Sequence, residues 1–407
     1  MNRGPAVRLR SIAAAAIAAV ALAALLHSPA LVFAALCAAF LTALVVATRR
    51  RVFSAVTFER TLSRRVVSWG GELEVTVSVT NAKLLPLLWM RVRDQWPAGL
   101  EPLGFTLRPR GRGLQVFEQT VSVRWYELLR RRYRVRCTAR GLQRFGPVEL
   151  EAGDPFGVAG VRDELEARAE IAVLPKVLDV PDLKAFLGRP LAEEAAARSL
   201  ASDPTALRGI REYRAGDPLR AINWRATARV GELQTNEFEP ASLAAVRLLL
   251  DVGVLQNAWQ GMGPERMELL CVVTASLAAA FAAQGFGVGL ASNARLMGDW
   301  RVADIEPAQG ALPEVLEMLA RVHLFTARGF ERMLAVELAD ESSPAECLVV
   351  TAALRESVLD RLAQLRAERP TRVVYVGRPT EAEARFVDAV VPAEFDWRSS
   401  DALPLLA

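Results

Sequence analysis

Side chains that could act as nucleophiles, general bases or phosphate ligands are few in this 407-residue sequence. A Gly-Lys-Ser/Thr phosphate-binding loop is absent, because the three lysines follow Ala82, Pro175 and Leu183. The sequence also lacks a Gly-x-Ser-x-Gly nucleophile elbow. Its two histidines and four cysteines do not cluster as zinc ligands do, and His323 lies in an apolar stretch typical of a half-buried structural residue. The sequence therefore favours a protein that is not an enzyme and has no cofactor.

Residues 207–229 combine turn residues, aromatic residues and charges of both signs. Asp217 precedes Pro218, an arrangement that suits the cap and first position of a short helix. Arg214 and Arg220 are close enough in sequence to pair with Asp217. The residues alone leave two interpretations open: a structural turn held by ion pairs, or a binding site.

The N-terminal region predicts a membrane anchor. Residues 11–48 carry no formal charge, and two apolar stretches at about 12–26 and 31–47 flank Pro29. A spanning helix needs about 20 residues, so we expect a helical hairpin. Six arginines and no acid lie among residues 1–51, which predicts that both ends of the hairpin are cytoplasmic. The alternative is a cleaved signal peptide covering about the first 30 residues, but the second apolar stretch and Arg49–Arg51 disfavour it.

The net charge gives no reason to expect a nucleic-acid partner. The chain has 50 basic and 46 acidic residues, and six of the basic ones lie in the N-terminal 51 residues. The 44 basic residues that remain are outnumbered by the acids, whereas a nucleic-acid binder needs a basic body or face. Four cysteines far apart in sequence are expected to be reduced thiols.

Residues 52–178 predict an all-β, sandwich-like domain. Residues 72–80 alternate apolar and polar side chains, and residues 116–125 and 132–139 are similar. Arginines recur at every second position of one predicted strand face, at Arg130, Arg132, Arg134 and Arg136. This face is solvated, or it contacts anionic lipid headgroups, or it contacts a partner protein or nucleic acid.

Strand and helix patterns alternate after residue 235. Expected strands at 245–251, 287–291, 347–351 and 372–376 are separated by expected helices at 265–283, 313–322 and 356–366. This order is typical of a parallel sheet covered by helices. We place this α/β domain at 235–397, after a connector at 179–234.

The segment after residue 210 resembles the signature of the bacterial membrane-protein family called domain of unknown function 58. The resemblance runs through Arg211, Tyr213, Gly216-Asp217-Pro218, Arg220, Ile222, Trp224, Ala228 and Arg229. A second family motif is similar to Asp154, Pro155, Phe156 and Gly157. Asn223 stands where the family often has Asp. The interaction signature that follows from this resemblance comprises Arg211, Tyr213, Arg214, Gly216, Asp217, Arg220, Asn223 and Trp224.

The resemblance implies a von Willebrand factor A-like (Rossmann-like) C-terminal domain. Such domains can hold a divalent cation through Asp-x-Ser-x-Ser after the first strand. Here the motif begins at Asp251, but Gly253 and Leu255 replace both serines, so the site is degenerate and we expect no bound metal. Asp251 is expected to make local contacts instead.

The resemblance also implies a location in the bacterial inner membrane, with two spans and cytoplasmic soluble domains. It implies work with a MoxR-type AAA+ ATPase in complex maturation or envelope-related processes. The leading hypothesis is therefore a membrane-anchored interaction or scaffold protein. Two alternatives stay open: an envelope- or peptide-directed enzyme with a site near Asp217, and a scaffold that binds anionic lipids.

Overall fold

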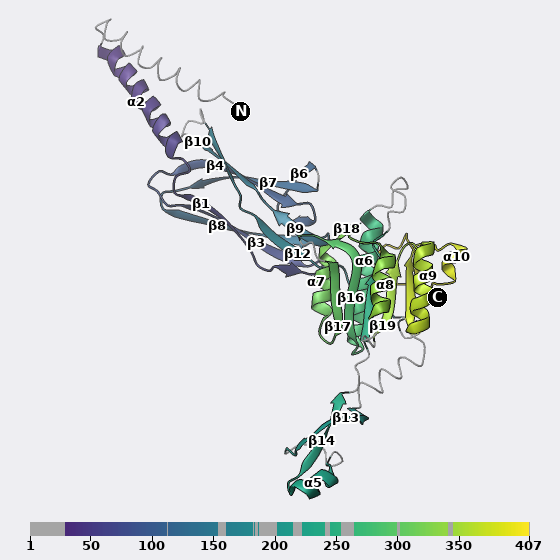
Figure 1. Ribbon diagram of the computed structural model, residues 1–407. Coiled ribbons are helices and arrows are strands. Elements are labelled where there is room, and N and C mark those ends of the chain that lie inside the picture. The colour runs from purple at the N-terminus through teal and green to yellow at the C-terminus, as the bar shows by residue number, and fades with distance from the viewer. Residues whose placement is uncertain are drawn as a thin grey trace. The chain divides into compact units, whose positions relative to one another are not determined.

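The computed structural model describes residues 29–111, 113–153, 160–181, 183, 186, 202–214, 222–240, 245–253, 264–298, 302–340 and 345–406 (Figure 1). The chain divides into two compact units, Met1–Val173 and Leu174–Ala407. The boundary lies before the predicted one at 178. Lys176 belongs to the second unit because its Nζ donates hydrogen bonds to the carbonyl oxygens of Trp397, Arg398 and Ser400.

Helix α2 (Pro29–Arg51) contains the second predicted apolar stretch. It is continuous through 23 residues, and Phe33, Leu36 and Phe40 are exposed on it. At 1.5 Å per residue such a helix is about 34 Å long, which is enough to cross a bilayer core of about 30 Å. The first predicted stretch, residues 12–26, lies outside the described residues.

The remainder of the first unit is β-rich, as predicted. Its four-stranded sheet has the order β1 (Val56–Leu62), β3 (Glu72–Asn81), β8 (Glu127–Cys137) and β5 (Leu100–Leu103). Its five-stranded sheet has the order β11 (Gly160–Leu165), β10 (Val148–Gly153), β4 (Leu87–Pro97), β7 (Leu114–Val123) and β6 (Arg108–Gly111). A small third sheet joins β2 (Val66–Val67), β12 (Ala169–Val173) and β9 (Gly141–Phe145).

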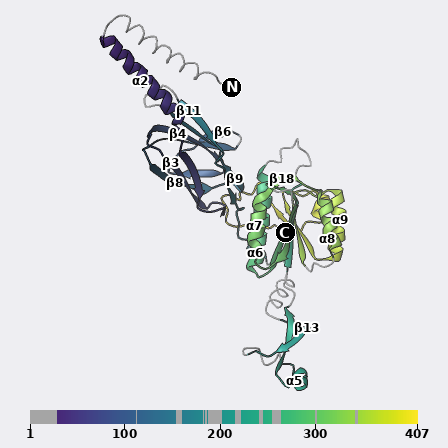
Figure 2. The same ribbon diagram turned by 60° about the vertical axis from the view of Figure 1, so that its left-hand side comes forward.

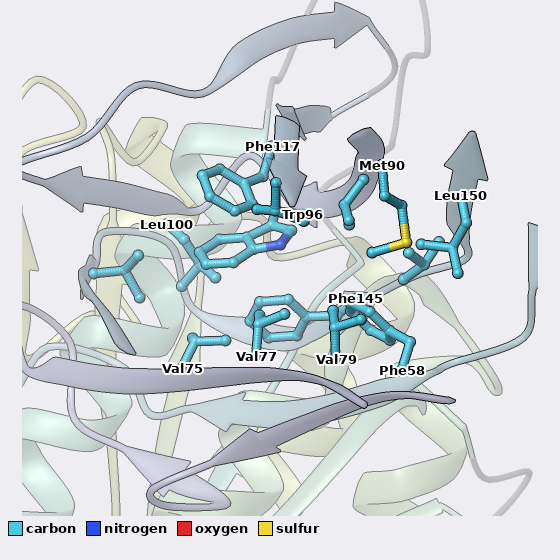
Figure 3. Close-up of a cluster of buried hydrophobic side chains, with 14 of the residues drawn as sticks. Phe58, Val75, Val77, Val79, Met90, Trp96, Leu100, Phe117, Phe145 and Leu150 are labelled. Carbon is cyan, nitrogen blue, oxygen red and sulfur yellow. The ribbon is translucent and has the colours of Figure 1, made fainter. Parts of the chain in front are cut away.

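One apolar core lies inside this unit. Strand β3 alternates strictly, so that Val75, Val77 and Val79 point from one sheet toward Trp96 and Phe145 (Figure 3). Trp96 is fully buried, and its ring meets Phe145 at a centroid distance of 5.4 Å. The period-2 pattern of the sequence therefore becomes the inner face of a half-buried sheet.

The arginines of β8 lie on the face opposite this core, as the alternation predicts. Arg130, Arg132, Arg134 and Arg136 are exposed, whereas Val135 is buried. Arg132 lies 3.7 Å from Glu74 and Arg134 lies 3.9 Å from Glu72, in ion pairs on the exposed face. Exposed pairs of this kind contribute little to stability.

The second unit contains a mixed, mostly parallel sheet. Its order is β17 (Val302–Ala308), β16 (Gly287–Leu296), β15 (Ala245–Leu250), β19 (Glu346–Thr351), β20 (Thr371–Val376) and β21 (Ala389–Val391), with β18 (Val322–Thr326) also paired to β16. Strands β17 and β18 run antiparallel to β16. Strand β15 lies between β16 on one side and β19 on the other, and it runs parallel to both. The strands that follow β15 in the chain therefore lie on both sides of it, which makes the end of β15 a topological switch point.

Helices cover both faces of the sheet. Figure 2 shows α6 (Pro264–Ala283) and α7 (Leu312–Arg321) on one face, and α8 (Phe330–Ala339) and α9 (Glu356–Glu368) on the other. The short helix α10 (Glu381–Ala384) precedes β21. The unit continues beyond the predicted end at 397, because Leu403 and Leu405 are buried and Leu406 pairs with Val390.

Helix α6 is a core helix with buried side chains along most of its length. It is long and apolar enough to cross a membrane, but 67% of its most apolar stretch is buried within the protein. A helix that is apolar on all sides is typical either of a core or of a membrane. The burial identifies α6 as part of the core.

Candidate functional site

Part of the signature forms a small hairpin with a helix between its strands. Strand β13 (Ser202–Glu212) pairs antiparallel with β14 (Gln234–Pro240), and α5 (Trp224–Val230) lies between them. This arrangement differs from the prediction of a connector up to 234 followed by the α/β domain, because β14 pairs with β13 and the parallel sheet begins at β15. The hairpin places Arg211 opposite Thr235.

Asn223 fixes the start of α5. Its Oδ1 accepts a hydrogen bond from the backbone N–H of Ala226 at 3.0 Å, and its Nδ2 donates to Asn236 Oδ1 at 2.7 Å. Asparagine and aspartate are both good N-cap residues. Asn223 therefore performs the capping that an Asp would perform here and also ties α5 to β14. Gly231 ends the helix with a φ of 84°, a left-handed conformation that favours glycine.

Trp224 extends into solvent from the first turn of α5. Its exposed fraction is 68%, and the apolar side chains of Ile210, Val230 and Leu233 in the same hairpin are also exposed. Exposed apolar side chains of this kind are available for contact with a partner. We call these four residues the Trp224 surface.

Some of the remaining signature residues lie in or beside the hairpin, and the others lie outside the described residues. Tyr213 continues the hairpin beyond β13, because its N–H donates to the Leu233 carbonyl at 2.9 Å. Arg211 donates to the Glu212 carbonyl at 3.0 Å, and Arg214 is exposed. The predicted site residues that lie outside the described residues are Gly216, Asp217, Arg220, Asp154, Pro155, Phe156 and Gly157.

A second polar cluster lies at the switch point of the parallel sheet. Asp251 follows β15 and is only 5% exposed. Its Oδ1 accepts hydrogen bonds from Asn293 Nδ2 at 2.7 Å and from the Gly253 N–H at 2.8 Å. Its Oδ2 lies 3.0 Å from the hydroxyl of Thr351, at the end of β19. Polar residues in or directly after three neighbouring strands thus meet at one carboxylate. The hydrogen bond from the Gly253 N–H is a local contact of the kind expected for Asp251.

Burial raises the pKa of Asp251, although its three hydrogen-bond donors and the charge of Arg355 act in the opposite direction. The carboxylate borders a pocket of about 60 Å³. Arg328, Glu331 and Arg355 also line this pocket, which gives it charged walls of both signs. A space of this size accommodates one small polar group or a few water molecules.

The donor set fits a divalent cation poorly. A hard cation requires about six oxygen ligands, and several are usually carboxylates. At this cluster Asp251 supplies one carboxylate, Asn293 presents its amide nitrogen to it, and Asn293 Oδ1 already accepts from Val252 N–H at 2.9 Å. A Cβ at Gly253 would lie 2.8 Å from Asp251 Oδ1, so a serine would force this turn to shift. Among the described residues of this cluster, the oxygen atoms free to bind a hard cation are therefore few.

Asp251 is predicted from the sequence as a residue of this cluster, whereas Thr351 and Asn293 are not. The signal was present in the pair Ser292-Asn293, two polar residues in an otherwise apolar stretch. Both are buried in β16, where Ser292 Oγ donates to the Leu250 carbonyl at 2.9 Å. Buried polar side chains need partners, and these two find theirs at the end of β15.

A family model described as "Protein of unknown function DUF58" matches residues 209–387. The segment 209–387 of this chain belongs to the DUF58 family. The match begins in β13 and includes both the Trp224 surface and the Asp251 cluster. The chain is also 25% identical over 331 residues to "Uncharacterized protein YeaD" of Bacillus subtilis (strain 168), covering 80% of this chain and 76% of that protein.

Two solved structures show weak similarity. The CARDB domain of the PF1109 protein from Pyrococcus furiosus is 18% identical, with 29% of this chain and 87% of that chain covered and a TM-score of 0.20. A cohesin module from Clostridium perfringens is 12% identical, with 29% and 97% covered and a TM-score of 0.21. Similarities this low support no conclusion about the fold or function of this chain.

Proposed function

We propose that this chain is a membrane-anchored interaction protein without catalytic activity, and that its partner is a MoxR-type AAA+ ATPase. The observation that carries the proposal is the exposure of Trp224 within the family signature. Tryptophan is among the residues that most often dominate binding energy at protein interfaces. A tryptophan that braced the fold would be buried, whereas this one is available to a partner.

The other parts of the chain support the same role. Helix α2 and the apolar residues before it supply the anchor, and the arginines at its end favour cytoplasmic soluble domains in the bacterial inner membrane. The strand order β17-β16-β15-β19-β20-β21 is the one expected of a von Willebrand factor A-like domain. Its Asp251 cluster then serves as a hydrogen-bonded brace or small recognition pocket rather than as a metal centre.

Partner capture from membranes tests this function. Tagged full-length chain is crosslinked reversibly in cells, solubilised and purified, and the co-purified AAA+ ATPase is quantified. Trp224→Ala should reduce capture about tenfold or more, since loss of an interface tryptophan commonly costs 2 kcal/mol or more, roughly thirtyfold in affinity.

Val336→Ala is the matched control, because Val336 is an exposed apolar residue on α8. It should leave capture unchanged. Equal capture by the wild-type chain and both variants, or no AAA+ ATPase in any sample, would overturn the proposal.

A further inference from the structure

A group of exposed apolar side chains lies at one end of the β-rich unit. Leu84 is 75% exposed in the β3–β4 loop, and Trp125 and Tyr126 are 61% and 66% exposed in the β7–β8 loop. Leu88 and Leu128, near the starts of β4 and β8, are exposed as well. We call these five residues the apical patch. Large apolar side chains gathered at loop tips are unusual on a surface that faces only water.

The two loops are held together by a buried amide. Asn81 Nδ2 donates to the Leu85 carbonyl at 3.0 Å and to the Arg124 carbonyl at 2.8 Å. The Tyr126 N–H donates to the Lys83 carbonyl at 3.3 Å. The apical patch is therefore a fixed part of the fold, presented by two cross-linked loops.

The same end of the unit receives helix α2. Val52 directly follows the helix and is already buried in the β core. Lys83 Nζ donates to the Val52 carbonyl at 2.6 Å and to the Ser54 carbonyl at 3.0 Å, and the Ala82 N–H donates to the Ala55 carbonyl at 2.9 Å. The loop that carries Leu84 is thus bonded to the residues that leave the helix.

We infer that the apical patch inserts into the bilayer–water interface beside α2. This inference rests on the proposed membrane anchoring. If α2 spans the bilayer, its end at Arg51 lies at the interface, and the short connection through Val52 holds the patch there. Tryptophan and tyrosine are enriched at this depth, together with basic residues. Arg51 and Arg124 are exposed basic residues at this end.

The opposite end of the unit provides a matched control. Strand β3 runs from Glu72 to Asn81, so its two ends are about 30 Å apart at 3.3 Å per residue. Ser68 is exposed and precedes the far end of β3. A probe at Ser68 should therefore remain in water if the patch is at the membrane.

Site-specific fluorescence in vesicles tests the inference with the full chain. A nitrobenzoxadiazole label is attached to native Cys37 in α2, or to Trp125→Cys or Ser68→Cys in a Cys37→Ala background. The other three cysteines are buried and remain unlabelled. The protein is reconstituted in phosphatidylcholine–phosphatidylglycerol vesicles, with and without lipids brominated near the headgroup end or deep in the acyl chains.

The fluorescence emission of the label at position 125 should shift to shorter wavelength. The shallow bromines should quench this label several-fold more than the label at position 68. The label at 37 should be quenched most by the deep bromines. Quenching at 37 with equal, weak quenching at 125 and 68 would overturn the apical patch inference and leave the anchor standing. No quenching at 37 would instead overturn the anchor, and the inference with it.

Discussion

Asn293 donates a hydrogen bond from Nδ2 to Asp251 Oδ1 over 2.7 Å, although the two residues are 42 positions apart in sequence. The contact joins β16 to the turn that follows β15. Because Asn293 Oδ1 also accepts from the Val252 N–H, one amide satisfies both the carboxylate and the backbone of that turn. The switch point is therefore organised by side-chain hydrogen bonds, and its behaviour with pH follows from them.

The stability of the second unit should depend on the ionisation of Asp251. Burial raises the pKa of Asp251 in the folded state above its unfolded value of about 3.9. The folded state then binds the proton more tightly. Relative to a non-titrating Asp251→Asn variant, the wild-type unit should become more stable as pH falls from neutral through the folded-state pKa, and the gain should level off below about pH 4.

The difference in stability between the wild type and Asp251→Asn is measured by urea unfolding of the full-length chain in detergent over a pH series. Proteolytic cleavage of the second unit reports its unfolding at each pH. The wild-type and Asp251→Asn curves should diverge in favour of the wild type toward acid pH. A difference that stays constant with pH, or that grows toward alkaline pH in favour of the wild type, would show that Asp251 does not titrate as its burial implies.

Removal of Asp94 should strongly destabilise the β-rich unit. Asp94 and Arg60 form an ion pair in which both side chains are 1% exposed, and Trp96 Nε1 also donates to Asp94 Oδ2 at 2.6 Å. Asp94→Ala leaves the Arg60 charge buried without its partner, which costs about 3–5 kcal/mol in the free energy of unfolding. Glu170→Ala removes the exposed pair with Arg144 and should cost less than about 1 kcal/mol. Similar losses in the two variants, measured by urea unfolding, would contradict the assignment.

The cap of α5 should tolerate aspartate but not alanine. Asn223→Ala removes the acceptor for the Ala226 N–H and should destabilise α5 by about 1 kcal/mol. Asn223→Asp keeps an acceptor at the same place and should preserve the helix. Hydrogen exchange of the amides in Trp224–Val230 distinguishes the two variants. Equally fast exchange in both would mean that the bond to Asn236, rather than the cap, holds the helix.

The buried thiols should be inert at ordinary pH. Burial raises the pKa of Cys137 to about 11 and that of Cys347 to about 12. At pH 8 their thiolate fractions are about one in a thousand or less, and the thiolate is the reactive form. Iodoacetamide should therefore modify these two cysteines only after unfolding, as measured by mass spectrometry, whereas an exposed cysteine introduced as Ser68→Cys serves as the labelled reference. Rapid native modification of Cys137 would contradict its burial.

The sequence predicts much of the fold because strand alternation and apolar runs are local signals. The run ending at Thr351 became β19, and the alternation of residues 72–80 became β3. Local patterns do not reveal pairing between distant strands. The β13–β14 hairpin and the antiparallel strands β17 and β18 were not predicted for this reason. Gly289 shows the same limit, because it lets the Ile305 carbonyl of another strand approach, 2.6 Å from where a Cβ would lie.

The residues of the candidate sites are also only partly predictable from the sequence. Asp251 is recognisable in sequence because it ends an apolar run, whereas Asn293 becomes significant only when β16 is placed beside β15. Trp224 is recognisable through the family signature, but its exposure is a property of the folded hairpin. The exposed pair Trp125 and Tyr126 becomes a candidate surface only in the folded structure. There the Asn81 amide fixes their loop, and Lys83 bonds the neighbouring loop to the residues after α2.

We propose that the chain binds an AAA+ ATPase through the Trp224 surface. Photo-crosslinking with benzoylphenylalanine in place of Trp224, in full-length chain in native membranes, tests it most directly. We expect a light-dependent adduct with an AAA+ ATPase from position 224 and none from position 336. Absence of that adduct at 224, or equal adducts at both positions, would contradict it.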